Sequence, residues 1–173
     1  FELAARHLSD EEILTRLQRW MVEERANACT KVLHSERSSL PEIADALRRY
    51  HEVLSDVGEL PEHTVSGIRV ALIQKLLTEQ VDFVKVAKEY VGTRAIERIL
   101  DRVIMTGDSR GKLGGKAAGV ILAHRILRKT PDIADEFKVK VPTSWFVPSS
   151  AMRQFIAHND LEDVFEQKYK RVD

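Results

Sequence analysis

Two amphipathic segments near the start of the chain, each with its own capping residues, limit the possible fold most strongly. Ser9 and Ser39 are each followed three residues later by a glutamate, Glu12 and Glu42, which is the capping-box pattern of a helix start. Apolar residues then recur every three or four positions, as on one face of an α-helix. They are Ile13, Leu17, Trp20, Met21 and Ala28 in the first segment and Ile43, Leu47, Tyr50, Leu54 and Val57 in the second. The spacing predicts helices over residues 9–33 and 39–57.

The next fifty residues continue the helical pattern. The apolar spacing predicts further helices over residues 61–76, 83–90 and 93–103, the first beginning at Pro61 and the last capped by Thr93. Each predicted helix has one apolar stripe and a charged back, so the stripes are expected to pack together in a small, mainly α bundle. The aromatic residues on these stripes are expected in the core, namely Trp20, Tyr50, Phe83 and Tyr90.

The charge of the chain is balanced overall but concentrated in its middle. The 173 residues include 27 Lys and Arg against 27 Asp and Glu, so the formal net charge is zero. Residues 94–129 contain nine basic and three acidic residues, whereas the segments on either side are net acidic. Positive charge beside permissive backbone suits a phosphate-bearing ligand. Charge alone, however, favours a solvated basic helix beside a flexible loop.

Composition and motifs argue against several classes of protein. The neutral balance and the lack of aromatic residues in 94–129 disfavour a nucleic-acid partner. The longest apolar run, residues 117–123, is too short to span a bilayer, so no membrane partner is expected. Cys29 is the single cysteine and the six histidines are scattered, so we expect neither a disulfide, a metal site nor a catalytic thiol. A reducing cytoplasm is the simplest compartment.

Residues 113–119, LGGKAAG, are the stretch most typical of a binding site, and they lie at the start of a helix predicted over 116–129. Gly114 and Gly115 allow the backbone to approach an oxyanion closely, and a helix start presents unpaired amides and a positive dipole end. Lys116 slightly opposes that dipole, and an anionic ligand would explain its presence. A glycine turn that permits tight helix packing, with Lys116 in solvent, explains the motif equally well. The stretch does not have the spacing of a P-loop.

The pattern changes again towards the end of the chain. Residues 139–147 alternate apolar and polar side chains, which predicts a strand, and Pro142 and Pro148 favour a place at an edge or a strand end. One strand cannot satisfy its own backbone. Its partner would be residues 103–106, another chain or the rest of a larger sheet domain. Ser149 or Ser150 is expected to cap a following helix.

Together these motifs resemble a known family. Residues 113–123 (LGGKAAGVILA), followed by residues 141–147 (VPTSWFV) and a helix, resemble the start of the PEP/pyruvate-binding domain of pyruvate phosphate dikinase and phosphoenolpyruvate synthase. The specific match covers residues 82–158. The resemblance implies an ATP-grasp-type domain whose opening α+β piece is residues 93–173, preceded by a helical region, residues 1–92.

The resemblance also implies an activity and its residues. Proteins of this family use ATP and Mg²⁺ to phosphorylate a protein histidine or a small acceptor such as pyruvate. The family's Gly-Gly-Lys lysine contacts the ATP phosphates, a role that carries to Lys116, with Gly114 and Gly115 as backbone contacts. Arg110 occupies a place where related sequences often have a basic residue. The family's magnesium carboxylates and phosphohistidine domain lie further along. The chain is therefore expected to be an N-terminal fragment without catalytic residues, which binds ATP weakly or not at all.

Two other interpretations belong to different classes of protein. The chain is alternatively a non-enzymatic helical protein-interaction module in which the glycine loop is a connector. A homo-oligomer is compatible with either of these interpretations. A nucleic-acid module that uses the basic segment, residues 94–129, is the weakest interpretation, since aromatic residues are absent from it.

Overall fold

The computed structural model describes residues 7–57, 60–130 and 140–163, and these residues are mainly helical. The sequence predicted a mainly α fold, and the structure confirms it. No strand is assigned within the three ranges. The helices are α2 (Asp10–His34), α3 (Leu40–Val57), α4 (Glu62–Leu76), α5 (Val81–Tyr90), α6 (Thr93–Leu100), α7 (Gly115–Lys129) and α9 (Ser149–His158).

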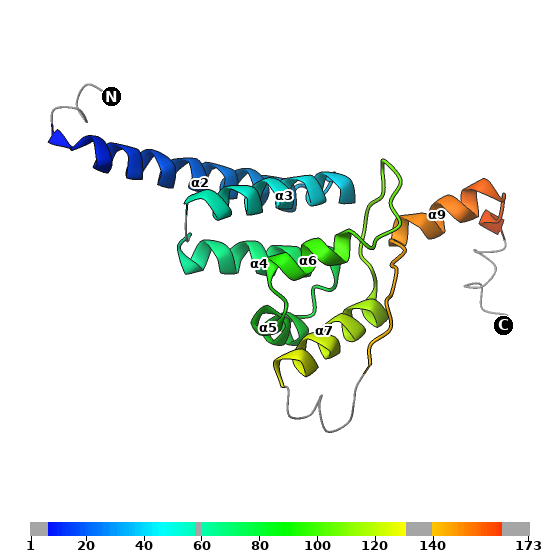
Figure 1. Ribbon diagram of the computed structural model, residues 1–173. Coiled ribbons are helices and arrows are strands. Elements are labelled where there is room, and N and C mark those ends of the chain that lie inside the picture. Colours follow the sequence, from blue (N-terminus) through cyan, green and yellow to red (C-terminus); the bar gives the residue numbers. More distant parts are fainter. Residues whose placement is uncertain (1–6, 58–59, 131–139, 164–173) are drawn as a thin grey trace.

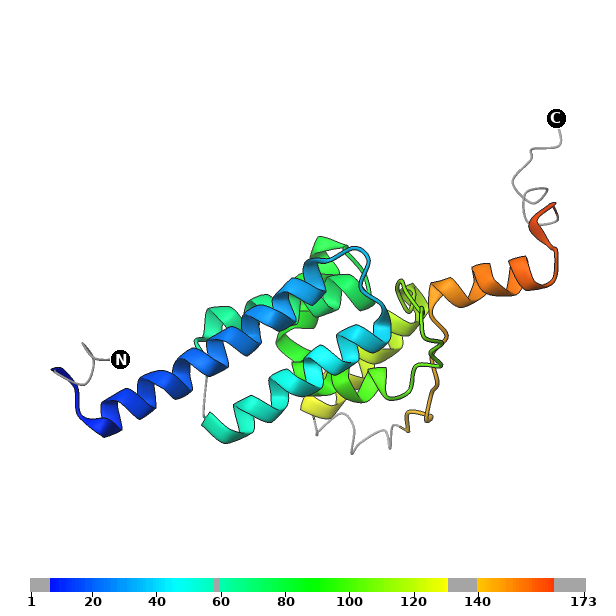
Figure 2. The same ribbon diagram turned by 90° about the horizontal axis from the view of Figure 1, so that it is seen from above.

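The helices form a bundle with two extensions (Figure 1). α2 packs against α3 and α4, α6 packs against α3 and α4, and α5 packs between α4 and α7. The first half of α2 projects beyond α3 and α4, and α9 points away from the bundle on the opposite side, as both views show (Figure 2). α9 packs on no other described helix and is joined to the molecule through loop backbone.

Both capping boxes form as the sequence predicts. Ser9 Oγ accepts a hydrogen bond from the Glu12 amide at 3.3 Å, and the Glu12 carboxylate accepts one from the Ser9 amide at 2.8 Å. Ser39 and Glu42 make the same pair of bonds, at 3.4 and 2.7 Å. These bonds satisfy backbone amides that a helix start otherwise leaves unpaired. They fix the starts of α2 and α3 at the predicted positions.

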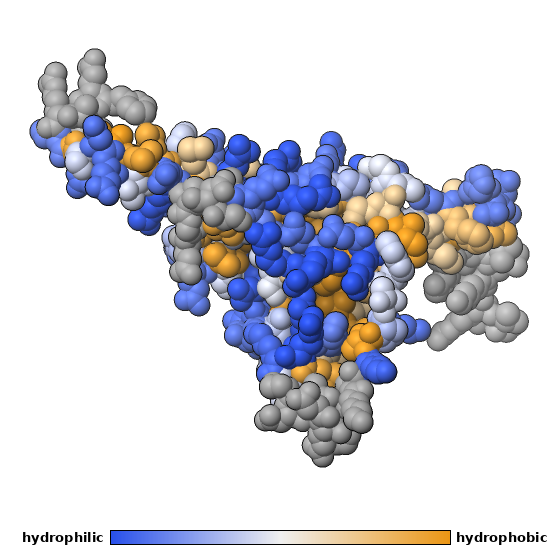
Figure 3. Space-filling view, in the orientation of Figure 1, coloured by the Kyte–Doolittle hydropathy of each residue, from blue (hydrophilic) through white to orange (hydrophobic). Residues whose placement is uncertain are grey.

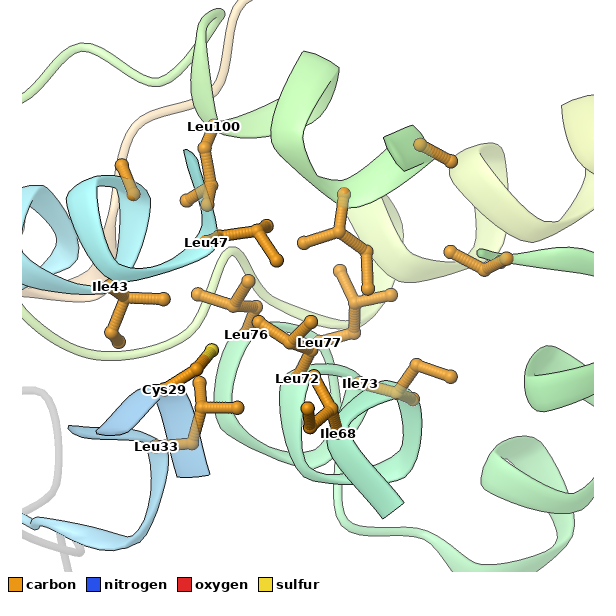
Figure 4. Close-up of a cluster of buried hydrophobic side chains, with 14 of the residues drawn as sticks. Cys29, Leu33, Ile43, Leu47, Ile68, Leu72, Ile73, Leu76, Leu77 and Leu100 are labelled. Atoms are coloured by element: carbon orange, nitrogen blue, oxygen red, sulfur yellow. The ribbon is translucent and has the colours of Figure 1, made fainter. Parts of the chain in front are cut away.

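The core lies where α2, α3, α4 and α6 meet (Figure 4). Leu47, Leu72 and Ile73 have no exposed surface, and Tyr50 is 1% exposed. The predicted stripe of α3 is therefore buried at Ile43, Leu47 and Tyr50 and half-buried at Leu54. The cluster of buried side chains continues from α2 through to Ala118 and Ile121 of α7.

The predicted core stripe of α2 is wrong at Trp20, Met21 and Ala28, all of which are exposed. Trp20 is 60% exposed and Met21 is 53% exposed. The side chains that α2 buries are Val22, Ala26, Cys29 and Leu33. Trp20 precedes Val22 by two positions, or about 200° around the helix, so it faces away from the buried stripe. The predicted face found no partner because α2 continues past the ends of α3 and α4.

The predicted strand is reduced to a single bridge. Val103 and Phe146 form an isolated parallel β-bridge, in which the Ile104 amide donates to Phe146 O and the Phe146 amide donates to Arg102 O, both at 2.9 Å. Residues 140–147 are irregular apart from this contact. A ladder needs further strands beside it, and none is present among the described residues. Val139 of the predicted strand lies outside the described ranges.

The predicted caps of two helices differ in detail. α6 begins at Thr93, and Gly92 is its N-cap. α9 begins at Ser149 with Pro148 as N-cap, so neither Ser149 nor Ser150 caps it. The hydroxyls of Thr93 and Ser150 are engaged elsewhere: Thr93 Oγ1 contacts His51, and Ser150 Oγ accepts a hydrogen bond from the Arg110 amide.

No described helix combines the length and the apolar content that a bilayer crossing requires.

A buried histidine joins α3 to α6. The His51 side chain is 2% exposed, its Nδ1 lies 2.7 Å from Glu97 Oε2 and its Nε2 lies 2.9 Å from Thr93 Oγ1. Burial lowers the pKa of His51, although the Glu97 carboxylate opposes this effect. His51 is therefore neutral at neutral pH: Nδ1–H donates to Glu97, and Nε2 accepts from the Thr93 hydroxyl. The burial of the ring makes this a structural contact between helices.

The free energy of unfolding is expected to fall between about pH 7 and pH 5. Because the folded pKa of His51 lies below the unfolded value of about 6.5, the unfolded chain binds more protons in this window. The contribution of His51 is complete above pH 6.5 and is lost as the pH falls towards the folded pKa, by at most about 1.4 kcal/mol per pH unit. Urea unfolding at several pH values measures the slope, which His51→Gln should flatten. Stability that instead rises on acidification would show a protonated His51 paired with Glu97.

Candidate functional site

The glycine-rich loop, residues 106–114, is fixed to the bundle at two points. The Leu40 amide donates to Ser109 O at 2.7 Å, and the Leu113 amide donates to Leu76 O at 2.8 Å. Within the loop, buried Ser109 accepts a hydrogen bond from the Thr106 amide through its Oγ, at 2.6 Å. The loop is held in place by backbone bonds to the starts and ends of other helices.

The same loop holds the start of α9. The Ser149 amide donates to Lys112 O at 3.1 Å and the Ser150 amide donates to Arg110 O at 3.3 Å. In return, Ser150 Oγ accepts from the Arg110 amide at 3.0 Å. The first amides of α9 are therefore already used and are not available to a ligand.

Two glycines of the loop have backbone conformations that other residues rarely adopt. Gly111 has φ +90°, and a Cβ there would overlap Ser149 Oγ. Gly114 has φ +88° and ψ 162°, a region populated almost solely by glycine, with open space where a Cβ would lie. Gly111 therefore serves the packing of α9, whereas Gly114 turns the chain into α7.

The start of α7 is exposed and uncapped. Gly114 is its N-cap and offers no side chain, and the first turn contains no acidic residue. The first amide with a partner is that of Ala118, which donates to Gly114 O at 3.0 Å. The amides of Gly115, Lys116 and Ala117 precede it and make no hydrogen bond within the described part of the chain. An unpaired, positively polarised helix end of this kind favours an anion.

Lys116 occupies the second position of α7, as predicted. Its side chain is exposed, and it makes no ion pair with any side chain in the described ranges. Gly114, Gly115 and Lys116 are thus brought together at one helix end.

Arg110 is placed differently. It lies in the loop, exposed, and its backbone is bonded to Ser150. Among the described residues no hydrogen bond or ion pair joins its guanidinium to the start of α7. Lys112, in contrast, is engaged, with Nζ 2.6 Å from Glu79 Oε1.

A second basic region was missed in the sequence. A pocket of about 270 Å³ lies between α6, α7 and residues 141–146. Its lining includes Arg98, Arg102, His124, Arg125 and Arg128. The signal that could have revealed it was the excess of positive charge over residues 94–129. The sequence could not show that these side chains converge, because they come from two helices and the segment after α6.

The described residues include no arrangement of side chains suited to metal binding or to thiol catalysis. No group of three or more His, Cys, Asp or Glu side chains there is placed to hold a metal ion. Cys29 is buried, and burial raises the pKa of its thiol to about 11. The nucleophilic form is the thiolate, so Cys29 stays protonated and serves as a core residue.

Comparisons of the chain with protein-family models, with curated proteins and with solved structures find no significant match. The resemblance to the PEP/pyruvate-binding domain is therefore a hypothesis that depends on the residues quoted for it.

Substituting the two loop glycines should separate their roles. Gly111→Ala combines an unfavourable φ with an overlap on Ser149, so it should lower the free energy of unfolding more than Gly114→Ala. Gly114→Ala meets no atom and carries only the backbone strain, on the order of 1–3 kcal/mol. Urea denaturation of both variants measures the difference. Equal stability of Gly114→Ala and the unsubstituted chain would show that the turn into α7 does not have the conformation described.

Proposed function

We propose that this chain supplies part of the ATP phosphate-binding surface of an ATP-dependent phosphotransferase similar to pyruvate phosphate dikinase and phosphoenolpyruvate synthase. The observation that carries the proposal is the exposed start of α7, where three unpaired amides and Lys116 follow a turn that Gly114 makes. In this proposal, residues 93–173 are the opening piece of the ATP-grasp-type domain. The cytoplasm supplies the ATP and a small acceptor such as pyruvate.

The proposal depends on polar groups at the start of α7 that form no hydrogen bond or ion pair with the described residues. A lysine in the first turn of a helix opposes the helix dipole, and that small cost is not offset by any acidic neighbour in the described ranges. A phosphate at this point would accept hydrogen bonds from the amides of Gly115 to Ala117 and would neutralise the Lys116 ammonium group. Gly115 supports the same role, since no described atom lies within 4 Å of where its Cβ would be. The lack of a side chain there has no packing explanation.

The proposed contribution of this chain is positioning and charge. Phosphoryl transfer depends on several cationic groups and on Mg²⁺, which bridges the phosphates and offsets the charge that develops on them. Lys116 and the amides of α7 would hold one part of the triphosphate. Arg110 would act only if the loop places its guanidinium beside the same phosphates. We therefore expect the chain by itself to bind ATP weakly and to transfer no phosphoryl group to pyruvate.

Gly115→Ala gives the sharpest test of phosphate contact at α7. The variant should fold at least as stably, because alanine is the better helix former and its Cβ meets open space. It should nevertheless weaken ATP binding by about tenfold, or about 1.4 kcal/mol, because the added methyl group obstructs the close approach of a phosphate to the first amides of α7. Lys116→Ala should weaken binding similarly. Titration of the ¹⁵N-labelled chain with ATP, followed by NMR, measures the affinity and locates the shifted amides.

The matched control is Lys31→Ala, which removes an exposed lysine from α2 and should leave the ATP affinity unchanged. Shifts centred on residues 115–117 that are weakened in both site variants support the proposal. Undiminished binding in Gly115→Ala and Lys116→Ala would show that the glycine turn is structural only. Phosphoryl transfer by the chain alone would contradict the supporting role assigned to it.

A second candidate function, a helical protein-interaction module, is favoured by the projecting half of α2. Leu14, Trp20 and Met21 are each more than half exposed there. Figure 3 shows hydrophobic side chains along this projecting end. These side chains lie outside the buried stripe of α2, with Leu14 and Met21 on one flank and Trp20 on the opposite side. Exposed apolar groups of this kind mark interaction surfaces.

If the chain is a protein-interaction module, self-association through α2 is the interaction that can be measured directly. Sedimentation equilibrium of the chain should then show a reversible dimer, because the apolar face would be buried on association. Trp20→Glu should abolish it, whereas the control Val86→Glu, on the exposed side of α5, should not. A monomer at every concentration, or equal effects of the two substitutions, would exclude self-association through this face.

A further inference from the structure

The pocket beside α7 has the shape of a small binding site. α6 and α7 do not pack directly against each other. Residues 141–146 run alongside α7 and complete the pocket, as Figure 1 shows for the segment between α7 and α9. Its volume of about 270 Å³ is slightly below the range of roughly 300–1,000 Å³ that is usual for small-molecule sites. The pocket therefore suits a compact ligand rather than a whole nucleotide.

The pocket is lined by basic side chains, and no acidic side chain among the described residues is paired with its arginines. Arg98, Arg102, Arg125 and Arg128 line it together with His124. None of the four guanidinium groups forms an ion pair with an acidic side chain in residues 7–57, 60–130 and 140–163. The nearest acid on α6 by sequence, Glu97, is bonded instead to His51 and Arg94.

The side chains are close enough to affect one another. Burial first, and then the charges of Arg98 and Arg128, lower the pKa of Arg125. The pKa of His124 is lowered as well, by burial and then by Arg128, Arg125 and Arg102. Like charges gathered at one place repel each other and lower stability. An arrangement of this kind is stabilised when an anion occupies the space between the charges.

Helix dipoles explain only part of the cluster. Arg98 lies in the last turn of α6 and Arg128 in the last turn of α7, where a cation interacts favourably with the helix end. Arg125 is half-buried and lies a turn earlier in α7, and Arg102 follows the end of α6. Neither of these two has a partner among the described residues that accounts for its charge. Arg102 and Arg125 are therefore the residues that point to a ligand.

We propose that this pocket is a second anion site, which binds a compact diphosphate group between Arg102 and Arg125. Guanidinium groups donate planar pairs of hydrogen bonds that match phosphate oxygens. Thr143, on the segment that closes the pocket, adds a hydroxyl group that can donate to the same oxygens, whereas the Ser144 hydroxyl donates to Pro142 O. Buried Ile121 and the partly exposed Val120 form the apolar part of the lining.

This site is separate from the start of α7. Lys116 does not line the pocket, and His124 follows it by eight residues, or about 12 Å along the helix axis. The proposal goes beyond the function proposed above and does not depend on it. Either site can fail experimentally without affecting the other.

Isothermal titration of the chain with inorganic pyrophosphate tests the proposal, with orthophosphate as the single-phosphate comparison. We expect saturable binding of one pyrophosphate, weaker binding of orthophosphate, and weaker binding at higher salt. Arg102→Gln combined with Arg125→Gln should reduce the pyrophosphate affinity at least about tenfold, since two charge-assisted hydrogen-bonding groups are removed. The matched control, Arg49→Gln with Arg153→Gln, removes the same charge from α3 and α9 and should retain the affinity.

A second readout locates the bound anion. Pyrophosphate beside His124 should raise its pKa, because a negative charge favours the protonated ring. NMR titration of the imidazole measures this shift with and without pyrophosphate. The shift should persist in Lys116→Ala, which distinguishes this pocket from the start of α7. Thermal unfolding of each variant confirms that it is folded.

Several results would overturn the proposal. These are no saturable pyrophosphate binding, an equal loss in the control pair, or an affinity that depends on Lys116 and not on Arg125. Binding that appears only after Asp132, Asp135 and Glu136 are replaced by amides would also overturn it, since carboxylates of the chain itself would then neutralise the arginines. So would binding of a short single-stranded RNA by a chain that does not bind pyrophosphate.

Discussion

Two backbone hydrogen bonds, from Leu40 to Ser109 and from Leu113 to Leu76, determine where the second half of the molecule lies. They join the loop to the start of α3 and the end of α4, which are themselves fixed by a capping box and by a buried core. They fix the start of α7, which begins two residues after Leu113, while packing against α5 and the Val103–Phe146 bridge hold the segments that follow. The exposed helix start and the basic pocket are thus presented by a rigid support, which is the condition for a preorganised binding site.

The balanced net charge conceals a strong separation of charge in space. Basic residues of α6 and α7 meet at the pocket, while Lys116 adds a further cation at the other end of α7. Ion pairs elsewhere are mostly exposed, and such pairs add little stability. The four arginines that line the pocket form no ion pair with an acidic side chain among the described residues. They fit a chain that recognises phosphate at more than one point.

The sequence correctly predicted the features that depend on local geometry. The capping boxes at Ser9 and Ser39, the buried face of α3 and the position of Lys116 in α7 all follow from spacing of a few residues. The exposure of Trp20 did not follow, since it depends on where α3 and α4 end beside α2. The hydroxyl of Thr93 bonds to His51, 42 residues away, instead of capping α6. Competition of that kind is invisible in a linear sequence.

The two candidate sites also differ in whether the sequence predicted them. Gly114, Gly115 and Lys116 are adjacent in the chain, so their placement at one helix end was predictable. The arginine pocket was not, because Arg102 and Arg125 meet only after α6 and α7 are positioned by α4 and α5. The strand predicted over residues 139–147 was also limited by tertiary context. A single bridge between Val103 and Phe146 forms, and the remaining backbone of that segment finds no ladder among the described residues.

A crystal structure of the chain grown with ATP and pyrophosphate tests the central claim most directly, which is that α7 presents two separate anion sites. The account predicts a phosphate of ATP within hydrogen-bonding distance of the amides of residues 115–117 and of Lys116 Nζ. It predicts a second anion between the guanidinium groups of Arg102 and Arg125. Phosphates bound elsewhere, with α7 capped by another part of the chain and the arginines paired with carboxylates, would contradict it.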